Sequence, residues 1–204
     1  RVEGGRGAAE DCLRRIADHG VPNYFGEQRF GFGGRNVERA LAMFAGQRVD
    51  RQARSMLLSA ARSQLFNQVL ARRVDERNWN HGLDGEIWSL AGSRSWFGPE
   101  SWNETLAARL AEHDIHPSGP LWGRGDLPTQ AAARSLEIAA LQGSEALRKG
   151  LEQAGLEQDR RALRLIPRAL TWIWADADTL ELAFELPAGA YATVVVRELL
   201  DAQA

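Results

Sequence analysis

GVPNYFGEQRFGFGG, residues 20–34, sets aromatic rings among glycines between two stretches of helical pattern. The preceding stretch predicts a helix over 8–19, because its apolar residues have helical spacing and the pattern stops at Gly20. A short helix over 36–44 is predicted to follow, with Asn36 as its cap. The flat rings and flexible backbone between these helices make the segment a candidate binding site.

A long amphipathic helix is predicted next, over 50–77. This stretch has no glycine or proline, and one face carries apolar residues, namely Leu58, Ala61, Leu65 and Val69. Glycines interleave with tryptophans between 78 and 102, which predicts a small hairpin or irregular sheet. The segment 116–128 is interpreted as a loop, and further helices are predicted at 103–113, 129–141 and 144–154.

The pattern changes near residue 162. ALTWIWADADTLELAFELP (169–187) alternates with period two on both sides of a turn-rich centre, which predicts two antiparallel strands. VVVRELL (194–200) is compatible with a strand or a helix, and its apolar and charged faces favour a helix. A helical middle, roughly 49–158, between two mixed segments is typical of a helical insertion into an α+β domain.

Composition bounds the class of protein. The 204 residues are 44% hydrophobic and 25% charged, enough for one large domain or two small ones, which excludes disordered and collagen-like classes. Net charge is −2, but residues 1–74 hold 13 arginines and 7 acids. That distribution suits either a positive face for phosphates or a solvated arginine-rich surface. Cys12, the single cysteine, permits no internal disulfide, and a soluble, cytoplasmic location is expected.

Several local motifs carry weak chemical signals. GFGGRN (31–36) could cradle a phosphate, but it lacks dinucleotide spacing and a Walker lysine, which favours a turn with positive φ. His113, Asp114 and His116 could bind a metal, although no cysteine is near and a helix-end role is favoured. No G-x-S-x-G elbow accompanies the serines. The seven tryptophans could stack on bases, but core packing is the better interpretation.

Two distant stretches resemble a known family. GVPNYFGEQRFG (20–31) is similar to the signature of the TruD family of tRNA pseudouridine synthases, and LAFELPAGAYATVVVREL (182–199) is similar to its closing motif. RSMLLSAARSQLFNQVLARRV (54–74) and SGPLWGRG (118–125) resemble segments of the family's inserted domain. The resemblance covers nearly the whole chain.

The resemblance implies an α+β fold. It consists of part of a pseudouridine synthase core, a mixed or antiparallel sheet with helices, interrupted by a mainly helical family-specific insertion. Residues 1–48 and 159–204 would belong to the core and residues 49–158 to the insertion.

The resemblance also implies a reaction, the isomerisation of uridine 13 in tRNA to pseudouridine. The glycosidic bond breaks, the uracil turns and its C5 rejoins C1′, with an aspartate initiating the reaction and no metal or organic cofactor. The base must leave its stack for this chemistry. By similarity, Asn23 would hydrogen-bond the nucleotide, Phe25 would supply a stacking face and Phe184 would contact the base from the other side.

The same residues have simpler interpretations when they are taken without the family. Asn23 could only shape a turn, and Phe184 could continue an apolar strand face formed by Leu180, Leu182 and Leu186. Arg29 could contact a phosphate or pair with a carboxylate in the core, and a phosphate contact would make binding strongly salt-dependent.

One departure from the family concerns the nucleophile. The family's catalytic aspartate lies in a G-x-K-D-[RK]-x-A motif upstream of the segment that corresponds to NYFGEQRFG, and these 204 residues contain no such motif. No catalytic residue is therefore assigned, and the chain is expected to be an inactive C-terminal portion of a longer enzyme. A smaller departure is Ala190, where the family more often has serine.

The expected partner is tRNA, and a monomer is favoured for the intact protein. Two alternatives stay open: a non-catalytic tRNA-binding protein, and a helical protein-interaction module without RNA contact.

Overall fold

Residues 5–201 are those that the computed structural model describes, and they form seven α-helices and eight strands. The helices are α1 (Gly5–His19), α2 (Arg35–Phe44), α3 (Arg51–Asp75), α4 (Glu104–Ala111), α5 (Ala131–Ala140), α6 (Glu145–Gln153) and α7 (Ala192–Asp201). The strands are β1 (Val21–Pro22), β2 (Glu86–Leu90), β3 (Trp96–Glu100), β4 (Ile115–Leu121), β5 (Asp159–Ala162), β6 (Arg164–Leu165), β7 (Arg168–Trp174) and β8 (Leu180–Glu185). Within this range, no helix combines the length and apolar character needed to cross a membrane.

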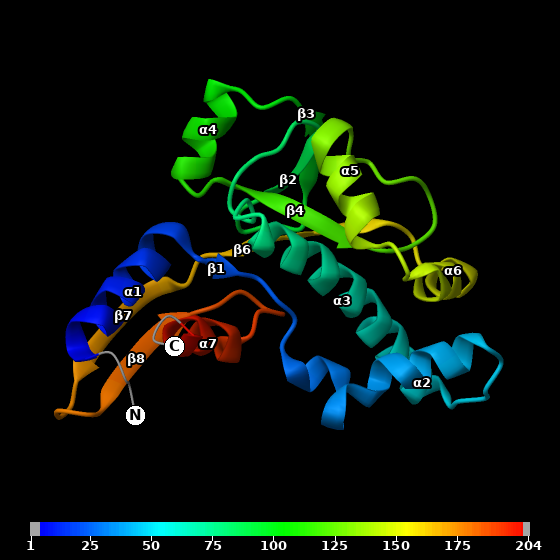
Figure 1. Cartoon of the computed structure of the whole chain (residues 1–204), viewed down its shortest axis with the longest axis horizontal. Helices are drawn as coiled ribbons and strands as arrows, with labels where there is room; N and C mark the ends of the chain where they lie inside the picture. Colours follow the sequence, from blue (N-terminus) through cyan, green and yellow to red (C-terminus); the bar gives the residue numbers. More distant parts are fainter. Residues whose placement is uncertain (1–4, 202–204) are drawn as a thin grey trace.

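The strands form three antiparallel sheets, ordered β1-β6, β3-β2-β4-β5 and β7-β8. Figure 1 shows α3 running diagonally through the middle of an elongated molecule. Helices α1 and α7 lie with the β7-β8 hairpin at one end, and α2 and α6 lie at the other. The larger sheet, with α4 and α5, lies above α3 in this view. The result is the α+β fold that the sequence predicts.

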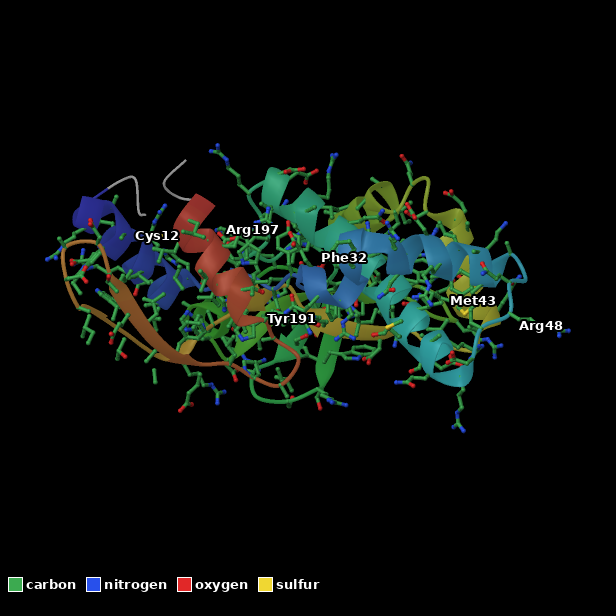
Figure 2. All side chains as sticks on the ribbon, turned by 90° about the horizontal axis from the view of Figure 1, so that it is seen from below. Cys12, Phe32, Met43, Arg48, Tyr191 and Arg197 are labelled. Carbon is green, nitrogen blue, oxygen red and sulfur yellow. The ribbon has the colours of Figure 1, made fainter. Side chains whose placement is uncertain are left out.

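The two ends of the chain share one core. Helix α1 contributes Cys12, Leu13 and Ile16, which pack against Val195 and Leu199 of α7. Figure 2 shows these two helices next to each other, with Cys12 and Arg197 labelled. The Cys12 thiol donates to the Glu198 carbonyl at 3.6 Å. Hydrophobic burial therefore joins segments that are almost 190 residues apart in the sequence.

A second core surrounds α3. Its predicted apolar face is confirmed, because the four residues named for it are all buried, namely Leu58, Ala61, Leu65 and Val69. Asp50 caps the helix by accepting a hydrogen bond from the Ala53 N–H at 2.7 Å. Other faces of α3 are covered as well, so that Ser59 and Asn67 contact the segment that follows β1.

Two predictions of secondary structure and capping were wrong. The segment predicted as a loop begins with β4, which lies between β2 and β5 although it contains Pro117 and Pro120. Proline cannot donate to a ladder, but its carbonyl can accept, and the Leu163 N–H donates to the Pro117 carbonyl at 2.8 Å. Asn36 does not cap α2, because Gly34 occupies that position and Asn36 is buried inside the helix.

The turn from α1 into β1 depends on Gly20. Its φ is +75°, and a Cβ there would lie 2.5 Å from the Leu165 carbonyl oxygen. Only glycine combines that backbone conformation with so close an approach. The turn lets Val21 pair with Leu165, and this pairing places the next residues of the chain beside β5.

The candidate metal residues serve structural contacts. His113 follows α4, and its Nε2 lies 2.9 Å from the Asp18 carbonyl oxygen. His116 lies in β4, so a helix-end role was wrong for it, and its Nδ1 accepts from Arg164 Nε at 3.0 Å. No group of three or more metal-ligating side chains occurs between residues 5 and 201.

His116 gives the fold a pH dependence. Burial and then the Arg164 charge lower the pKa of His116 from 6.5 to about 4, so the folded state binds fewer protons than the unfolded state in this range. The free energy of unfolding is therefore retained above pH 6.5 and falls as the pH drops from there towards 4. The loss is about 2 kcal/mol once the partial exposure of His116 is taken into account.

This pH dependence is measured by urea unfolding of the chain at several pH values. The difference in the free energy of unfolding between the unmodified chain and His116→Gln should grow as the pH falls through this window. Glutamine keeps an acceptor for Arg164 and does not titrate. His81→Gln, at an exposed position, serves as control. If the free energy of unfolding changes with pH in the same way for the unmodified chain and for His116→Gln, the assignment to His116 is contradicted.

Candidate nucleic-acid interface

Asn23 is fixed on three sides where the chain leaves β1. Its backbone N–H donates to the Leu163 carbonyl at 2.8 Å, and its Nδ2 donates to the Ala162 carbonyl at 2.8 Å. Its Oδ1 accepts from Arg161 Nη2 at 2.7 Å. These contacts set the orientation of the amide. One N–H and one acceptor position of the amide remain available for a further hydrogen bond. The residue is only 7% exposed.

Phe25 lies two residues further on and is held through its backbone. Its N–H donates to Asn67 Oδ1 at 2.9 Å, and its carbonyl accepts from Asn67 Nδ2 at 3.0 Å. The ring meets Phe66 edge-on at 5.4 Å and Tyr191 at 6.3 Å between centroids. Helix α3 and the residue before α7 thus set the position of a half-buried ring.

Two arginines lie against the Phe25 ring. The guanidinium carbon of Arg161 is 4.1 Å from the ring centroid and that of Arg29 is 5.4 Å away. Arg29 donates from Nε to the Tyr191 hydroxyl at 2.9 Å and from Nη1 to Ser59 Oγ at 2.7 Å. The alternative in which Arg29 pairs with a core carboxylate was wrong for the part of the chain described, since its hydrogen-bond partners there are two neutral hydroxyls.

These side chains form one group, called here the Phe25 cluster, made of Asn23, Phe25, Arg29, Arg161 and Tyr191. They come from the segment after β1, from β5 and from the residue before α7. Figure 2 shows Tyr191 at the end of α7 that faces the middle of the molecule. Burial, opposed by Tyr191 and reinforced by the Arg29 charge, lowers the pKa of Arg161 to about 10. Arg161 therefore stays protonated at neutral pH.

Phe184 lies outside this cluster. It sits on β8 with Leu180 and Leu182, on the face that packs against the core of α1 and α7. It is half-buried there, and Tyr191 packs against the same core. The structure thus brings Asn23, Phe25 and Arg29 together and places Phe184 in the adjoining core.

The glycine-rich turn after the cluster has the backbone predicted for it. Gly31, Gly33 and Gly34 all have positive φ, and Phe32 between them is 93% exposed. A hollow of about 420 Å³ lies beside this turn, lined by Glu27, Phe30, Gly31, Gly33, Gly34, Val37 and Gln64. The only charged residue in that lining is an acid, so the hollow is less suited to a polyanion than the Phe25 cluster is.

Sequence reasoning missed Arg161, although it contacts both Asn23 and Phe25. The available signal was the repeated arginine in DRRALR (159–164). In β5 the neighbouring side chains point to opposite faces, so Arg160 pairs with buried Glu137 and Arg161 reaches the Phe25 cluster. Only the pairing of β1 with β6 shows which of the two meets Asn23.

Comparisons with known proteins agree with one another. The family model described as tRNA pseudouridine synthase D (TruD) matches residues 33–199. Proteins named tRNA pseudouridine synthase D from Xanthomonas euvesicatoria and Hydrogenovibrio crunogenus are 55% and 45% identical to this chain, over 98% of its length. The chain spans 59% and 58% of those relatives.

A solved structure of a protein assigned to TruD from Methanosarcina mazei has the same fold. The TM-score is 0.71 at 17% identity, and the match covers 98% of this chain and 67% of that one. The family model and the identity to the bacterial relatives do not depend on this structural likeness. The chain belongs to the TruD family of tRNA pseudouridine synthases.

Proposed function

We propose that this chain forms part of a tRNA pseudouridine synthase that converts uridine 13 of tRNA to pseudouridine, and that the Phe25 cluster binds the target nucleotide. The names of the relatives support the activity. One observation carries the site: Asn23, Phe25, Arg161 and Tyr191 come from both ends of the chain and meet at one place.

The cluster offers what a detached pyrimidine needs. The amide of Asn23 has a fixed orientation and can give one further hydrogen bond to the uracil or ribose. The ring of Phe25 supplies a flat face on which the base can stack. If the base reaches the adjoining core, the ring of Phe184 supplies a second face. The glycosidic bond between N1 and C1′ can then break, the uracil can turn while it is held, and its C5 can bond to C1′ as C5 loses its proton and N1 gains one. In this proposal the nucleophilic aspartate is supplied by protein outside the 204 residues.

The domain assignment of the sequence analysis is retained as part of this proposal. Residues 1–48 and 159–204 would supply the catalytic core, and residues 49–158 would form the insertion. The packing supports this only in part. One core draws on residues from α1, β1 and the segment 165–199, but the core around α3 draws on residues between 37 and 156, so α2, which the assignment gives to the catalytic core, packs with the insertion. We expect a monomer that acts on tRNA in the cytoplasm.

The activity is tested on the complete product of the gene that encodes this chain. Unmodified tRNA is incubated with the protein, and pseudouridine is mapped by carbodiimide labelling and primer extension. The proposal expects a new stop at position 13 and none in a control tRNA with cytidine at that position. A tRNA that is bound but unmodified would favour the non-catalytic alternative. A tRNA that is not bound would exclude RNA as the partner.

A further inference from the structure

We propose that Arg29 and Arg161 form a phosphate-binding pair, which holds the RNA backbone beside the nucleotide that the Phe25 cluster binds. The ligand is a phosphodiester group of RNA. This inference rests on the proposed function, because it takes RNA as the partner, and it adds a binding subsite with two named cations.

The first support is that neither cation is neutralised. The structure has seven ion pairs over residues 5–201, and neither arginine is in one of them. Arg160, the neighbour of Arg161 in the sequence, pairs with Glu137 at 2.7 Å in the interior. The protein thus compensates one of two adjacent arginines and leaves the other with neutral partners.

Other arginines also lack a carboxylate, but their surroundings differ. Arg62 and Arg164 are single cations whose N–H groups mainly donate to backbone carbonyls. Arg29 and Arg161 instead share one aromatic ring, with guanidinium carbons 5.4 and 4.1 Å from the Phe25 centroid. Two like charges at one ring repel each other, and a bound anion removes that cost.

The second support is that each guanidinium is held in place while one terminal nitrogen is left over. Arg29 uses Nε and Nη1 for Tyr191 and Ser59, and Arg161 uses Nη2 for Asn23 and the Gly189 carbonyl at 3.1 Å. Among residues 5–201, Nη2 of Arg29 and Nη1 of Arg161 have no hydrogen-bond partner and are not buried atoms, whereas Arg161 Nε is buried and also has no partner. A planar group fixed in this way loses little freedom when it binds phosphate.

The third support is the position of the pair relative to the nucleotide site. Arg161 touches both Asn23 and Phe25, the residues proposed to contact the base. In RNA the phosphate of a nucleotide lies within one ribose of its base, so a base at Phe25 brings a phosphate close to these cations. The excess of arginine in residues 1–74 favours approach of a polyanion to this part of the chain.

The test is the salt dependence of tRNA binding by this chain. Affinity is measured by filter binding across salt concentrations of about 50 to 200 mM. Arg29→Gln and Arg161→Gln should each weaken binding about tenfold at low salt and lower the slope of log affinity against log salt by about 0.7–0.9. Arg72→Gln is the matched control, because Arg72 is exposed and pairs with Glu76 on α3. It should keep the slope of the unmodified chain.

The outcomes separate this inference from the proposed function. If neither the unmodified chain nor the complete gene product shows salt-sensitive tRNA binding, RNA as the partner fails, and with it both proposals. If only the complete product binds, the same variants are compared in that product. If binding persists and both glutamine variants keep the original slope, the phosphate pair alone is overturned, even where Arg161→Gln lowers the melting temperature. Arg161→Lys supports the pair if it restores most of the slope, because lysine keeps a point charge without the planar fork.

Discussion

Replacing Asn23 with alanine in the complete gene product is expected to slow pseudouridine formation on the order of 100-fold. The substitution removes the amide proposed to bond the nucleotide while it is detached. It also removes the Oδ1 that Arg161 Nη2 contacts at 2.7 Å, so a neighbouring cation loses its fixed position. The rate is measured under single-turnover conditions with unmodified tRNA, so that product release does not obscure the chemical step.

Asn103→Ala is the matched control for this experiment. Asn103 caps α4 by accepting from the Leu106 N–H at 3.0 Å, and its loss should cost about 1 kcal/mol of stability without affecting the reaction. Comparison of the two variants separates a local loss of stability from a loss of substrate contact. If Asn23→Ala turns over as fast as the Asn103 variant, Asn23 has only a structural role.

Glu86→Gln is expected to reduce the free energy of unfolding by about 3–5 kcal/mol. Glu86 on β2 and Arg73 on α3 form an ion pair at 2.9 Å, and their side chains are only 1% and 3% exposed. Glutamine keeps the shape and an acceptor oxygen but removes the negative charge, so the Arg73 charge stays in the interior with neutral partners, among them the carbonyls of Asn78 and His81. The measurement is urea unfolding of this chain at neutral pH.

The adjacent residue supplies the control for that prediction. Arg72→Ala breaks the pair with Glu76, which is exposed and lies one helical turn away, and should cost only about 0.3–0.5 kcal/mol. Replacing both buried partners, as in Arg73→Met with Glu86→Leu, should recover much of the lost stability, since no buried charge is then left unpaired. Equal small effects of Glu86→Gln and Arg72→Ala would contradict the assignment of Arg73–Glu86 as a structural ion pair.

Local pattern was enough to predict the helices and the two hairpins. The apolar spacing of α3, the alternation around Asp176 and the stop at Gly20 are encoded within a few residues each. Strand β4 was not recognisable in this way, because Pro117 and Pro120 are poor strand formers. Its place in the sheet comes from long-range contacts: a Cβ at Gly119 would lie 3.0 Å from the Phe66 ring of α3, so glycine lets the helix pack closely.

The candidate site was predictable only in part, for the same reason. Asn23, Phe25 and Arg29 lie in one short segment, and the structure brings them together. Arg161 and Tyr191 reach them from more than 130 residues away, through the pairing of β1 with β6 and the packing of α7. No spacing rule within one sequence identifies such partners. Whether Phe184 contacts a base stays a prediction.

Photo-cross-linking of the target nucleotide tests the central claim most directly. A tRNA carrying 5-iodouridine at position 13 is bound to this chain and irradiated, and the linked peptide is identified by mass spectrometry. The account predicts a cross-link within residues 20–34, at Phe25 or a neighbour, or at Phe184 if the base also reaches the adjoining core. A specific cross-link confined to α4, α5 or α6, from a complex that is competed by unlabelled tRNA, would contradict it.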